Sequence, residues 1–283
     1  MSKQAFLNYN GKIYRAGKLL ISPDNRSFRY GDGCFETIRM INRKIILEAE
    51  HFERLFSSIE LLKFEKPDFF TTTFLKEQMI QLTQKNLHDK DARIRLTIFR
   101  GDGGLYDAEN NIPGFIIQSW PLNAENTALN RTGLVLDIFP DARKASDNFS
   151  HIKSNNFLPY VMAALWARKN DLNDALVLNV YQRIADATIA NVFMVKDGIV
   201  KTPALTEGCI GGVMRKYLLR CLRKEGIPAE ETQVSVDDVK EASEIFLTNA
   251  VNGIRWVRKC GGSHYRLQLT SLLYKKFIEP LFC

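Results

Sequence analysis

The feature that most constrains the fold is the arrangement of strand and helix patterns in two groups, divided by one stretch without a pattern. In the first group, Asn10-Gly11 and Asn42-Arg43 are predicted turns between short strands at residues 6–9, 12–14, 34–41 and 44–47. From Glu48 the period becomes helical, with apolar residues at Phe52, Leu55, Phe56, Ile59 and Leu62. This helix is expected to end before Pro67.

The remaining sequence patterns also predict both helices and strands. A second helix is predicted at about 69–87, followed by strands at 93–99 and 114–120. Residues 121–133 have no period and are rich in Asn, Ala and Thr, which is typical of a linker. Beyond them, helices are predicted at about 155–169 and 212–225, and strands at 134–139, 175–180, 191–195, 199–201 and 245–248. The sequence therefore predicts an α+β protein with domains 1–121 and 134–283, joined by a linker at 122–133.

Length and composition are ordinary for a soluble, well-packed protein. The chain has 283 residues, of which 45% are hydrophobic and 25% charged, so two domains are feasible. It contains no run of about 18 apolar residues, so we expect no membrane span. The first residues, from Met1 to Phe6, include no apolar segment of signal-peptide length, so we expect a cytoplasmic protein.

Cysteine spacing and charge narrow the possible ligands. The five cysteines are an odd number with no C-x-x-C spacing, which favours reduced thiols over a disulfide framework or a zinc site. We therefore expect no metal. A net charge of +7 would suit a nucleic-acid partner or an anionic small substrate. The basic residues are scattered, and the densest group, at 215–224, has the spacing of a solvated helix face, so we expect no nucleic-acid partner.

Two residues about 33 positions apart could carry covalent chemistry. Lys153 lies in the phrase His151-Ile152-Lys153-Ser154-Asn155-Asn156, at the entry to an apolar helix. A lysine attacks a carbonyl when burial or a nearby cation lowers its pKa, although a lysine in a polar loop is more often solvated. Asp186 lies in an uncharged stretch, where it could equally be a turn residue. Together they suggest pyridoxal 5'-phosphate (PLP), which needs a lysine and an acid opposite its ring nitrogen.

Three weaker signals concern a phosphate group. The segment from Glu207 to Arg215 contains Gly211-Gly212 before a predicted helix, and free N–H groups at a helix start bind phosphate. The turn from Thr248 to Gly253 could offer further backbone N–H groups. Arg54, beside His51, supplies a fixed positive charge. Each of these could instead be an ordinary loop, turn or solvated arginine.

Taken in order, these phrases resemble the class IV aminotransferase family, the fold-type IV PLP enzymes. That family includes branched-chain aminotransferases, D-amino acid aminotransferases and 4-amino-4-deoxychorismate lyases. The resemblance covers about residues 8–257 and rests on five phrases: Tyr30-Gly31-Asp32-Gly33-Cys34-Phe35-Glu36-Thr37, His51-Phe52-Glu53-Arg54-Leu55, the Lys153 segment, Ala190-Asn191-Val192-Phe193 and Gly212-Val213-Met214-Arg215. It implies a D-amino acid aminotransferase-like fold, with a smaller N-terminal α/β sandwich and a larger C-terminal β-barrel-like domain. It also implies a homodimer with sites near the subunit interface.

The resemblance implies a role for each matching residue. Lys153 would form the Schiff base with the cofactor and then move a proton. Arg54 would bind the phosphate, and the backbone at Val213, Met214, Asn249 and Ala250 would hold its other oxygens. Asp186 would face the pyridine nitrogen, where the family usually has a glutamate. Because aspartate is shorter by one carbon, about 1.5 Å, a closer backbone or a water must make up the difference.

Several details of the resemblance favour the lyase. The phrases Gly31-Asp32-Gly33-Cys34-Phe35 and Arg100-Gly101-Asp102-Gly103-Gly104 look like those of the lyase, and Met214 stands where aminotransferases typically have threonine. The D-amino acid enzymes have tyrosine at the Phe35 position and an Arg-x-His carboxylate trap, which is missing between Gly101 and Asn111. The implied reaction releases pyruvate and 4-aminobenzoate from 4-amino-4-deoxychorismate, for folate synthesis.

Two other functions stay open at this point. A branched-chain or D-amino acid transaminase is the second possibility, because Glu36-Thr37-Ile38-Arg39 is shared widely in the family. A basic binding module is the non-enzymatic alternative. For an enzyme, the candidate substrate-binding residues are Phe35, Arg93, Arg95 and Arg100, and alternation along the strand lets only some of these arginines face the site.

Overall fold

The computed structural model describes residues 5–18, 20–122 and 128–282, and these form two compact units. Unit 1 comprises residues 1–123 together with 153–156, and unit 2 comprises residues 124–152 together with 157–283. The predicted boundaries did not anticipate that residues 153–156 belong with the first unit. Residues 123–127 of the predicted linker lie outside the described residues.

Unit 1 is built on a six-stranded antiparallel sheet in the order β2-β1-β6-β5-β3-β4. Its strands are β1 (Phe6–Tyr9), β2 (Lys12–Arg15), β3 (Gly33–Ile41), β4 (Lys44–Ile45), β5 (Asp91–Arg100) and β6 (Pro113–Pro121). Both predicted hairpin turns occur. Asn10 and Gly11 have φ of 49° and 83°, and Asn42 and Arg43 have φ of 48° and 65°, as turns matched to strand twist require.

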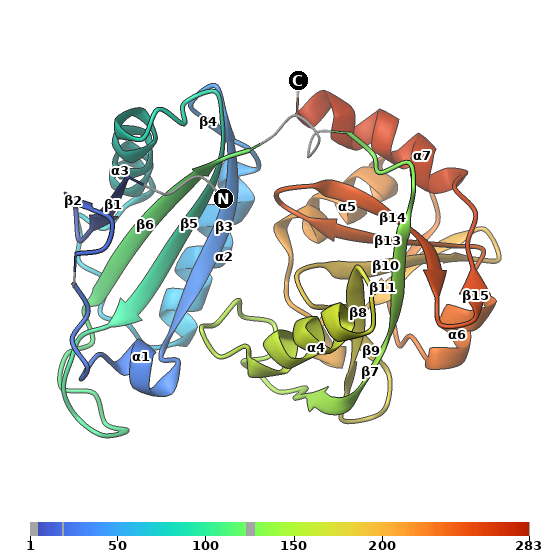
Figure 1. Cartoon of the computed structure of the whole chain (residues 1–283), viewed down its shortest axis with the longest axis horizontal. Coiled ribbons are helices and arrows are strands. Elements are labelled where there is room, and N and C mark those ends of the chain that lie inside the picture. The colour runs from blue at the N-terminus through green and yellow to red at the C-terminus, as the bar shows by residue number, and fades with distance from the viewer. Residues whose placement is uncertain (1–4, 19, 123–127, 283) are drawn as a thin grey trace. The chain divides into compact units, whose positions relative to one another are not determined.

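The helices of unit 1 are α1 (Arg26–Tyr30), α2 (Glu48–Leu61) and α3 (Thr72–Lys85). The α2 helix begins at Glu48, where the period changes, and buries Phe52, Leu55 and Ile59. It packs on β3, and α3 packs on β1 and β6, so that both helices lie against the sheet (Figure 1). The opposite face of β5 carries residues that are only partly buried, Arg93 and Arg95 among them.

Unit 2 contains a nine-stranded mixed sheet in the order β12-β11-β10-β13-β14-β7-β8-β9, with β15 paired to β14. Its strands are β7 (Leu134–Lys144), β8 (Asp174–Asn179), β9 (Ile184–Ala187), β10 (Asn191–Lys196), β11 (Ile199–Pro203), β12 (Ala229–Thr232), β13 (Glu244–Asn249), β14 (Gly253–Cys260) and β15 (Ser263–His264). The sheet curls around an apolar core that includes Leu176, Met194 and Leu247 (Figure 1). The expected α+β class is confirmed.

The helices of unit 2 are α4 (Leu158–Lys169), α5 (Val213–Lys224), α6 (Val236–Glu241) and α7 (Leu269–Leu273). Short 3₁₀-helices at Leu205–Glu207 and Glu279–Leu281 and a π-helix at Tyr274–Ile278 complete the unit. The α4 helix lies on β7 and β8 (Figure 1) and begins three residues after the predicted start at 155. The reason is that the residues before it pair with β3 instead.

Candidate functional site

Lys153 is held by its backbone at the edge of β3 in unit 1. The Phe35 N–H donates to the Lys153 carbonyl at 2.9 Å, and the Asn155 N–H donates to the Gly33 carbonyl at 2.9 Å. Cys34 and Ser154 form an antiparallel bridge between these bonds. The segment 153–155 therefore behaves as a short added strand, which fixes the position of the Lys153 α-carbon.

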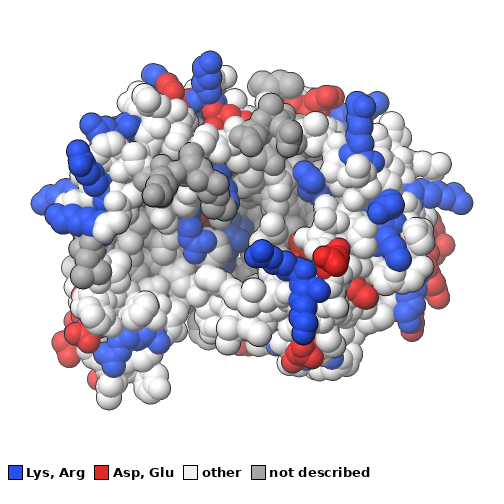
Figure 2. Space-filling view, viewed as in Figure 1, with Lys and Arg blue, Asp and Glu red and all other residues white. Residues whose placement is uncertain are grey.

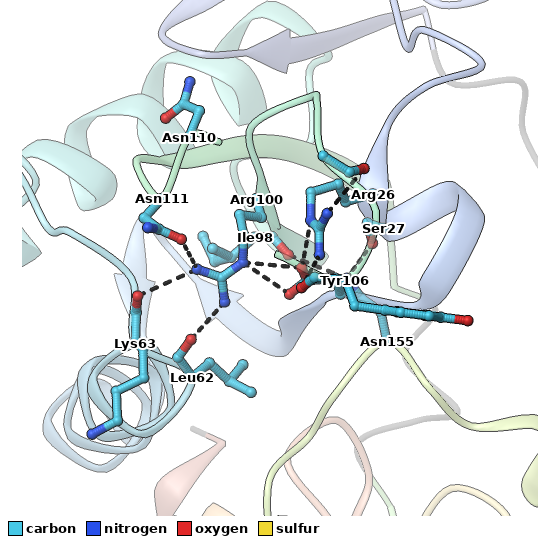
Figure 3. Close-up of polar contacts among 12 residues, drawn as sticks. Arg26, Ser27, Leu62, Lys63, Ile98, Arg100, Tyr106, Asn110, Asn111 and Asn155 are labelled. Atoms are coloured by element: carbon cyan, nitrogen blue, oxygen red, sulfur yellow. Dashed lines mark hydrogen bonds and ion pairs between the residues drawn. The ribbon is translucent and has the colours of Figure 1, made fainter. Parts of the chain in front are cut away.

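The side chain of Asn155 secures this segment further. Its Nδ2 donates to Ser27 Oγ at 2.8 Å and to the Ile98 carbonyl at 3.1 Å (Figure 3). Gly33 allows the close approach, because a Cβ there would stand 2.1 Å from the Ile98 carbonyl oxygen and 2.7 Å from Asn155 Nδ2. No side chain could be placed at Gly33 without moving the segment that carries Lys153.

Lys153 and Arg95 both lie at the ring of Phe35. Lys153 Nζ is 4.6 Å from the centre of that ring, and Arg95 Cζ is 3.8 Å from it. Burial, followed by the charge of Arg93, lowers the pKa of Arg95. Arg93 lies on the same face of β5, with its guanidinium 4.4 Å from the centre of the Trp120 ring. Nearby cations favour the neutral form of an amine, which is the form that attacks a carbonyl.

Arg100 belongs to a different cluster, in which buried arginines hold loops of unit 1 together. Its guanidinium donates to Asp32, to the Asn111 side chain at 2.8 Å and to the carbonyls of Leu62 and Lys63 (Figure 3). Asp32 also pairs with Arg26 at 3.0 Å. Arg26 in turn donates to the carbonyls of Gly103, Gly104, Leu105 and Tyr106. These contacts favour a structural role for Arg100 over the expected contact with a substrate.

Arg54 is fixed by a buried carboxylate. Its Nε donates to Glu36 Oε1 at 2.7 Å and its Nη2 donates to Oε2, while His51 Nδ1 lies 2.6 Å from Oε2. Burial raises the pKa of Glu36, but the charges and hydrogen bonds of Arg54 and His51 outweigh it and hold that pKa at about 2. Such a two-point contact sets the plane of the guanidinium and so preorganises it for an anion.

Asp186 lies in β9 of unit 2, a strand whose four residues are all buried, so it is not a turn residue. Its Oδ1 accepts from Asn191 Nδ2 at 2.9 Å, and its Oδ2 accepts from the Ile210 N–H and the Tyr160 hydroxyl, both at 2.8 Å. Lys144 Nζ forms an ion pair with Oδ2 at 3.3 Å. Burial raises the pKa of Asp186, and Lys144 and the hydrogen bonds oppose that rise.

Hydrogen bonds of Asn191 link Asp186 to the segment just before α5. Asn191 Nδ2 donates both to Asp186 and to the Ile210 carbonyl, the latter at 2.7 Å. A Cβ on Gly212, the N-cap of α5, would stand 1.9 Å from Asn191 Oδ1, so only glycine fits there. Val213 and Met214 follow in the first turn, where the backbone N–H groups give the helix its positive end.

The turn between β13 and β14 is held by a side chain. Asn249 Oδ1 accepts from the N–H groups of Val251 at 3.1 Å and of Asn252 at 2.8 Å. The register pairs Asn249 with Gly253 across the hairpin. Asn249 and Ala250 therefore sit in a turn at the end of a buried strand, and the Asn249 side chain fixes the shape of that turn.

Several described residues, some in unit 1 and some in unit 2, have the chemistry that would hold PLP. They include a lysine fixed by its backbone, a preorganised arginine, the N-terminus of a 12-residue helix and a buried acid. Sequence patterns missed Lys144 and Tyr160, because a basic residue in a loop and a tyrosine in a predicted helix carry no signal. Among the described residues, no cluster of His, Cys, Asp or Glu could hold a metal ion, and no helix is long and apolar enough to span a membrane.

Comparison with known proteins gives a matching family and several relatives that align with most of the chain. The model of the amino-transferase class IV family matches residues 33–260. An aminodeoxychorismate lyase of Vibrio harveyi is 29% identical over 232 residues, which is 81% of this chain and 83% of the lyase. A putative branched-chain-amino-acid aminotransferase of Methanocaldococcus jannaschii is also 29% identical, over 84% of this chain and 83% of that protein.

Solved structures of low sequence identity share the fold. A branched-chain aminotransferase from Thermoproteus uzoniensis has a TM-score of 0.87 at 20% identity and covers 99% of this chain and 95% of its own. A putative 4-amino-4-deoxychorismate lyase from Legionella pneumophila has a TM-score of 0.82 at 23% identity, covering 92% of this chain and 95% of its own.

Proposed function

The chain belongs to the class IV aminotransferase family, and we propose that it is a 4-amino-4-deoxychorismate lyase. As a member of this family it is a PLP-dependent enzyme that acts on amino compounds. This membership removes the alternative of a basic binding module. The basic side chains are dispersed among uncharged and acidic ones on the face drawn in Figure 2.

The observation that carries the proposal is the contact between the two lyase-like phrases. Asp32, from Gly31-Asp32-Gly33, binds the guanidinium of Arg100, from Arg100-Gly101-Asp102-Gly103-Gly104. Arg26 ties Asp32 to the carbonyls of residues 103–106. The two phrases thus form one cluster that is held by hydrogen bonds and ion pairs. The similarity to the Vibrio harveyi lyase supports the same choice.

Each residue then has a task in the proposed reaction. The cofactor, when bound, supplies the electron sink that lets a proton leave the carbon that bears the amine. Lys153 would hold the cofactor through its amine, and the same amine would move the proton that leaves the amine-bearing carbon of the substrate. The bond between the ring carbon and the enolpyruvyl oxygen then breaks, and the leaving group takes up the proton from Lys153 and departs as pyruvate. The product ring becomes aromatic, so this step runs downhill. Arg95 and Arg93 bind substrate carboxylates, and Phe35 packs against the substrate ring.

The remaining residues hold the cofactor in place. Arg54, oriented by Glu36, binds the phosphate. The backbone N–H groups of Val213 and Met214, at the positive end of α5, and those of Asn249 and Ala250 donate to its other oxygens. Asp186 faces the ring nitrogen from a buried strand. Because β9 is paired with β8 and Asp186 is held by Asn191, its carboxylate has little freedom to move.

A transaminase is the second candidate, because relatives of that activity match as well. The Methanocaldococcus jannaschii aminotransferase equals the lyase in identity, and a D-alanine aminotransferase of Listeria monocytogenes is 24% identical over 96% of this chain and 94% of that protein. In that reaction Arg95 would bind the α-carboxylate of an amino acid. The products would be a keto acid and the amine form of the cofactor.

We also propose a homodimer that works in the cytoplasm. One face of α4 exposes apolar side chains at helical spacing: Leu158 (64%), Val161 (40%), Met162 (46%) and Leu165 (56%). A monomer seldom exposes such a stripe, so a second copy of the chain is the occupant that we expect. Among the described cysteines, Cys34, Cys209, Cys221 and Cys260 are free thiols, as suits a reducing compartment.

One assay separates the two candidate reactions. The purified, PLP-loaded enzyme is supplied with 4-amino-4-deoxychorismate, and pyruvate and 4-aminobenzoate are measured. In parallel, branched-chain and D-amino acids are supplied with a keto acid acceptor, and Lys153→Ala serves as the inactive control for both. We expect turnover in the first reaction. Rapid transamination with no release of 4-aminobenzoate would replace the lyase with the second candidate.

A further inference from the structure

Lys144 is a buried cation beside the Asp186 carboxylate in unit 2. It ends β7, and its ammonium pairs with Asp186 Oδ2 at 3.3 Å. The Lys144 side chain is 11% exposed and that of Asp186 is 2% exposed, so water screens this pair only weakly. The ammonium also lies 5.3 Å from the centre of the Tyr160 ring. A charge in this position acts on any group that binds beside Asp186.

The other described hydrogen-bond donors to the Asp186 carboxylate are neutral. Of the donors that the structure describes at this carboxylate, the Asn191 amide, the Ile210 N–H and the Tyr160 hydroxyl carry no charge. Burial, followed by the charge of Asp186, raises the pKa of Tyr160 well above its ordinary value, so its hydroxyl stays protonated. Burial likewise raises the pKa of the Cys209 thiol to about 12. The charge of Arg215 also acts on Cys209, but Arg215 pairs with Glu231 at 2.7 Å. Among the described donors to Asp186, Lys144 is the one that carries a charge.

A pyridine nitrogen keeps its proton at neutral pH when an uncompensated negative charge stands beside it. An aspartate alone would supply that charge, but the pair of Asp186 and Lys144 has no net charge. Building on the proposed role of Asp186, we propose that Lys144 is a positioning residue that lowers the proton affinity of the cofactor ring nitrogen. Lys144 acts through Asp186, whose carboxylate it shares with the ring.

The size of the effect follows from Coulomb's law. Two groups that share one carboxylate lie about 5–8 Å apart, and an effective dielectric constant of about 20 suits a site of this kind. At that distance, removal of the ammonium is expected to raise the pKa of the ring nitrogen by about 1.5 to 2.5. Such a change is large enough to follow by titration.

The test reads the protonation of the ring nitrogen directly. Wild type, Lys144→Met and Lys144→Arg are loaded with PLP labelled with ¹⁵N in the ring, and the ¹⁵N chemical shift is followed against pH. In Lys144→Met the pKa of the ring nitrogen should rise by about 1.5 to 2.5. Lys144→Arg keeps the charge and should titrate as wild type does. If Lys144→Met fails to fold, Lys144→Gln, which keeps a donor but removes the charge, takes its place.

A matched control removes another paired lysine of unit 2. Lys196 pairs with Asp238 and Glu241, and it stands five residues along β10 from Asn191, about 16 Å away. Lys196→Met should leave the titration unchanged. Equal pKa values in wild type and in the uncharged Lys144 variants would overturn the proposal. A wild-type protein that takes up no labelled cofactor would instead contradict the proposed function itself.

Discussion

At the scale of single residues, the Asp186 carboxylate is a buried charge held by neutral donors and by one cation. Asp186→Asn removes the negative charge and leaves the Lys144 ammonium buried without its partner. We expect the variant to retain PLP through Lys153 and the phosphate contacts, but to lose turnover by about 10²-fold or more. The free energy of unfolding should fall by about 3–5 kcal/mol, as when one partner of a buried pair is removed.

The measurement compares cofactor content, kcat and urea unfolding for Asp186→Asn and for Asp174→Asn. Asp174 is a buried acid in the neighbouring strand β8, bonded to Thr188 rather than to a cation. Its variant should lose stability but keep turnover. Full activity of Asp186→Asn would show that the aspartate serves only the fold.

The titration of Glu36 is expected to make the free energy of unfolding depend on pH. Its pKa in the folded protein is about 2, against an ordinary value of 4.5. A lowered pKa stabilises the folded state above the unfolded value, and that contribution is lost as the pH falls from about 4.5 to 2. We expect Glu36 to contribute about 3 kcal/mol at pH 7 through this linkage.

Urea unfolding of wild type and Glu36→Gln between pH 7 and pH 3 tests this expectation. The wild type should lose stability more steeply on acidification than the variant, because the variant has no carboxylate to titrate. Parallel curves would show that the pair with Arg54 does not lower the pKa of Glu36. In the same variant, weaker PLP binding would report a loss of the Arg54 orientation.

The sequence could indicate residues that stand in recognisable phrases. Lys153, Arg54 and Asp186 were proposed from such phrases, and their roles toward the cofactor stay predictions. Lys144 and Tyr160 could not be proposed, because their contact with Asp186 depends on the register of β7, β8 and β9 and on the start of α4. Among the arginines of β5, alternation separates Arg95 from Arg100, as the pattern of burial shows.

At the scale of elements, the short segment 153–155 decides where Lys153 stands. Gly33→Ala would place a Cβ 2.1 Å from the Ile98 carbonyl oxygen and 2.7 Å from Asn155 Nδ2. The segment must then move away from β3, so we expect at least a tenfold loss of PLP affinity and a destabilisation of about 1–3 kcal/mol. Absorbance titration with PLP and thermal unfolding measure the two effects.

Gly262→Ala is the matched control, because a Cβ at Gly262 would meet nothing within 4 Å. It should bind PLP as wild type does. If Gly33→Ala also binds PLP normally, the edge of β3 does not position Lys153.

Long periodic elements were predictable and short buried ones were not. The α2 helix shows its period over four turns and begins at the predicted residue. The four residues of β9 are all buried, so they show no alternation by which a strand could be recognised. The predicted helix at 155–169 starts at Leu158, because pairing with β3 takes the backbone of the residues before it. Such long-range pairing leaves no local signal.

At the scale of the whole molecule, the exposed face of α4 predicts self-association. Leu165→Glu places a charge in the apolar stripe and should convert a dimer to a monomer, because an unpaired charge is costly to bury in an interface. Light scattering at several protein concentrations measures the mass. Leu87→Glu is the control, since Leu87 is 87% exposed on unit 1 and outside the stripe. A monomeric wild type, or a dimeric Leu165→Glu variant, would contradict this use of α4.

The family and the α+β class followed from the order of phrases and patterns, which is a property of the whole chain. The choice between lyase and transaminase depends on loops such as 101–106, whose conformation Arg26 fixes through carbonyl contacts that any sequence could make. The sequence therefore predicts the chemistry of the cofactor more securely than it predicts the identity of the substrate.

The measurement that tests the central claim most directly is the location of the covalent link to PLP. The loaded protein is reduced with borohydride, digested, and its peptides are identified by mass. We predict that the cofactor is fixed to Lys153, in the peptide that contains Ser154 and Asn155. Cofactor fixed to Lys144 or to another lysine, or a protein that stays colourless with added PLP, would contradict the account.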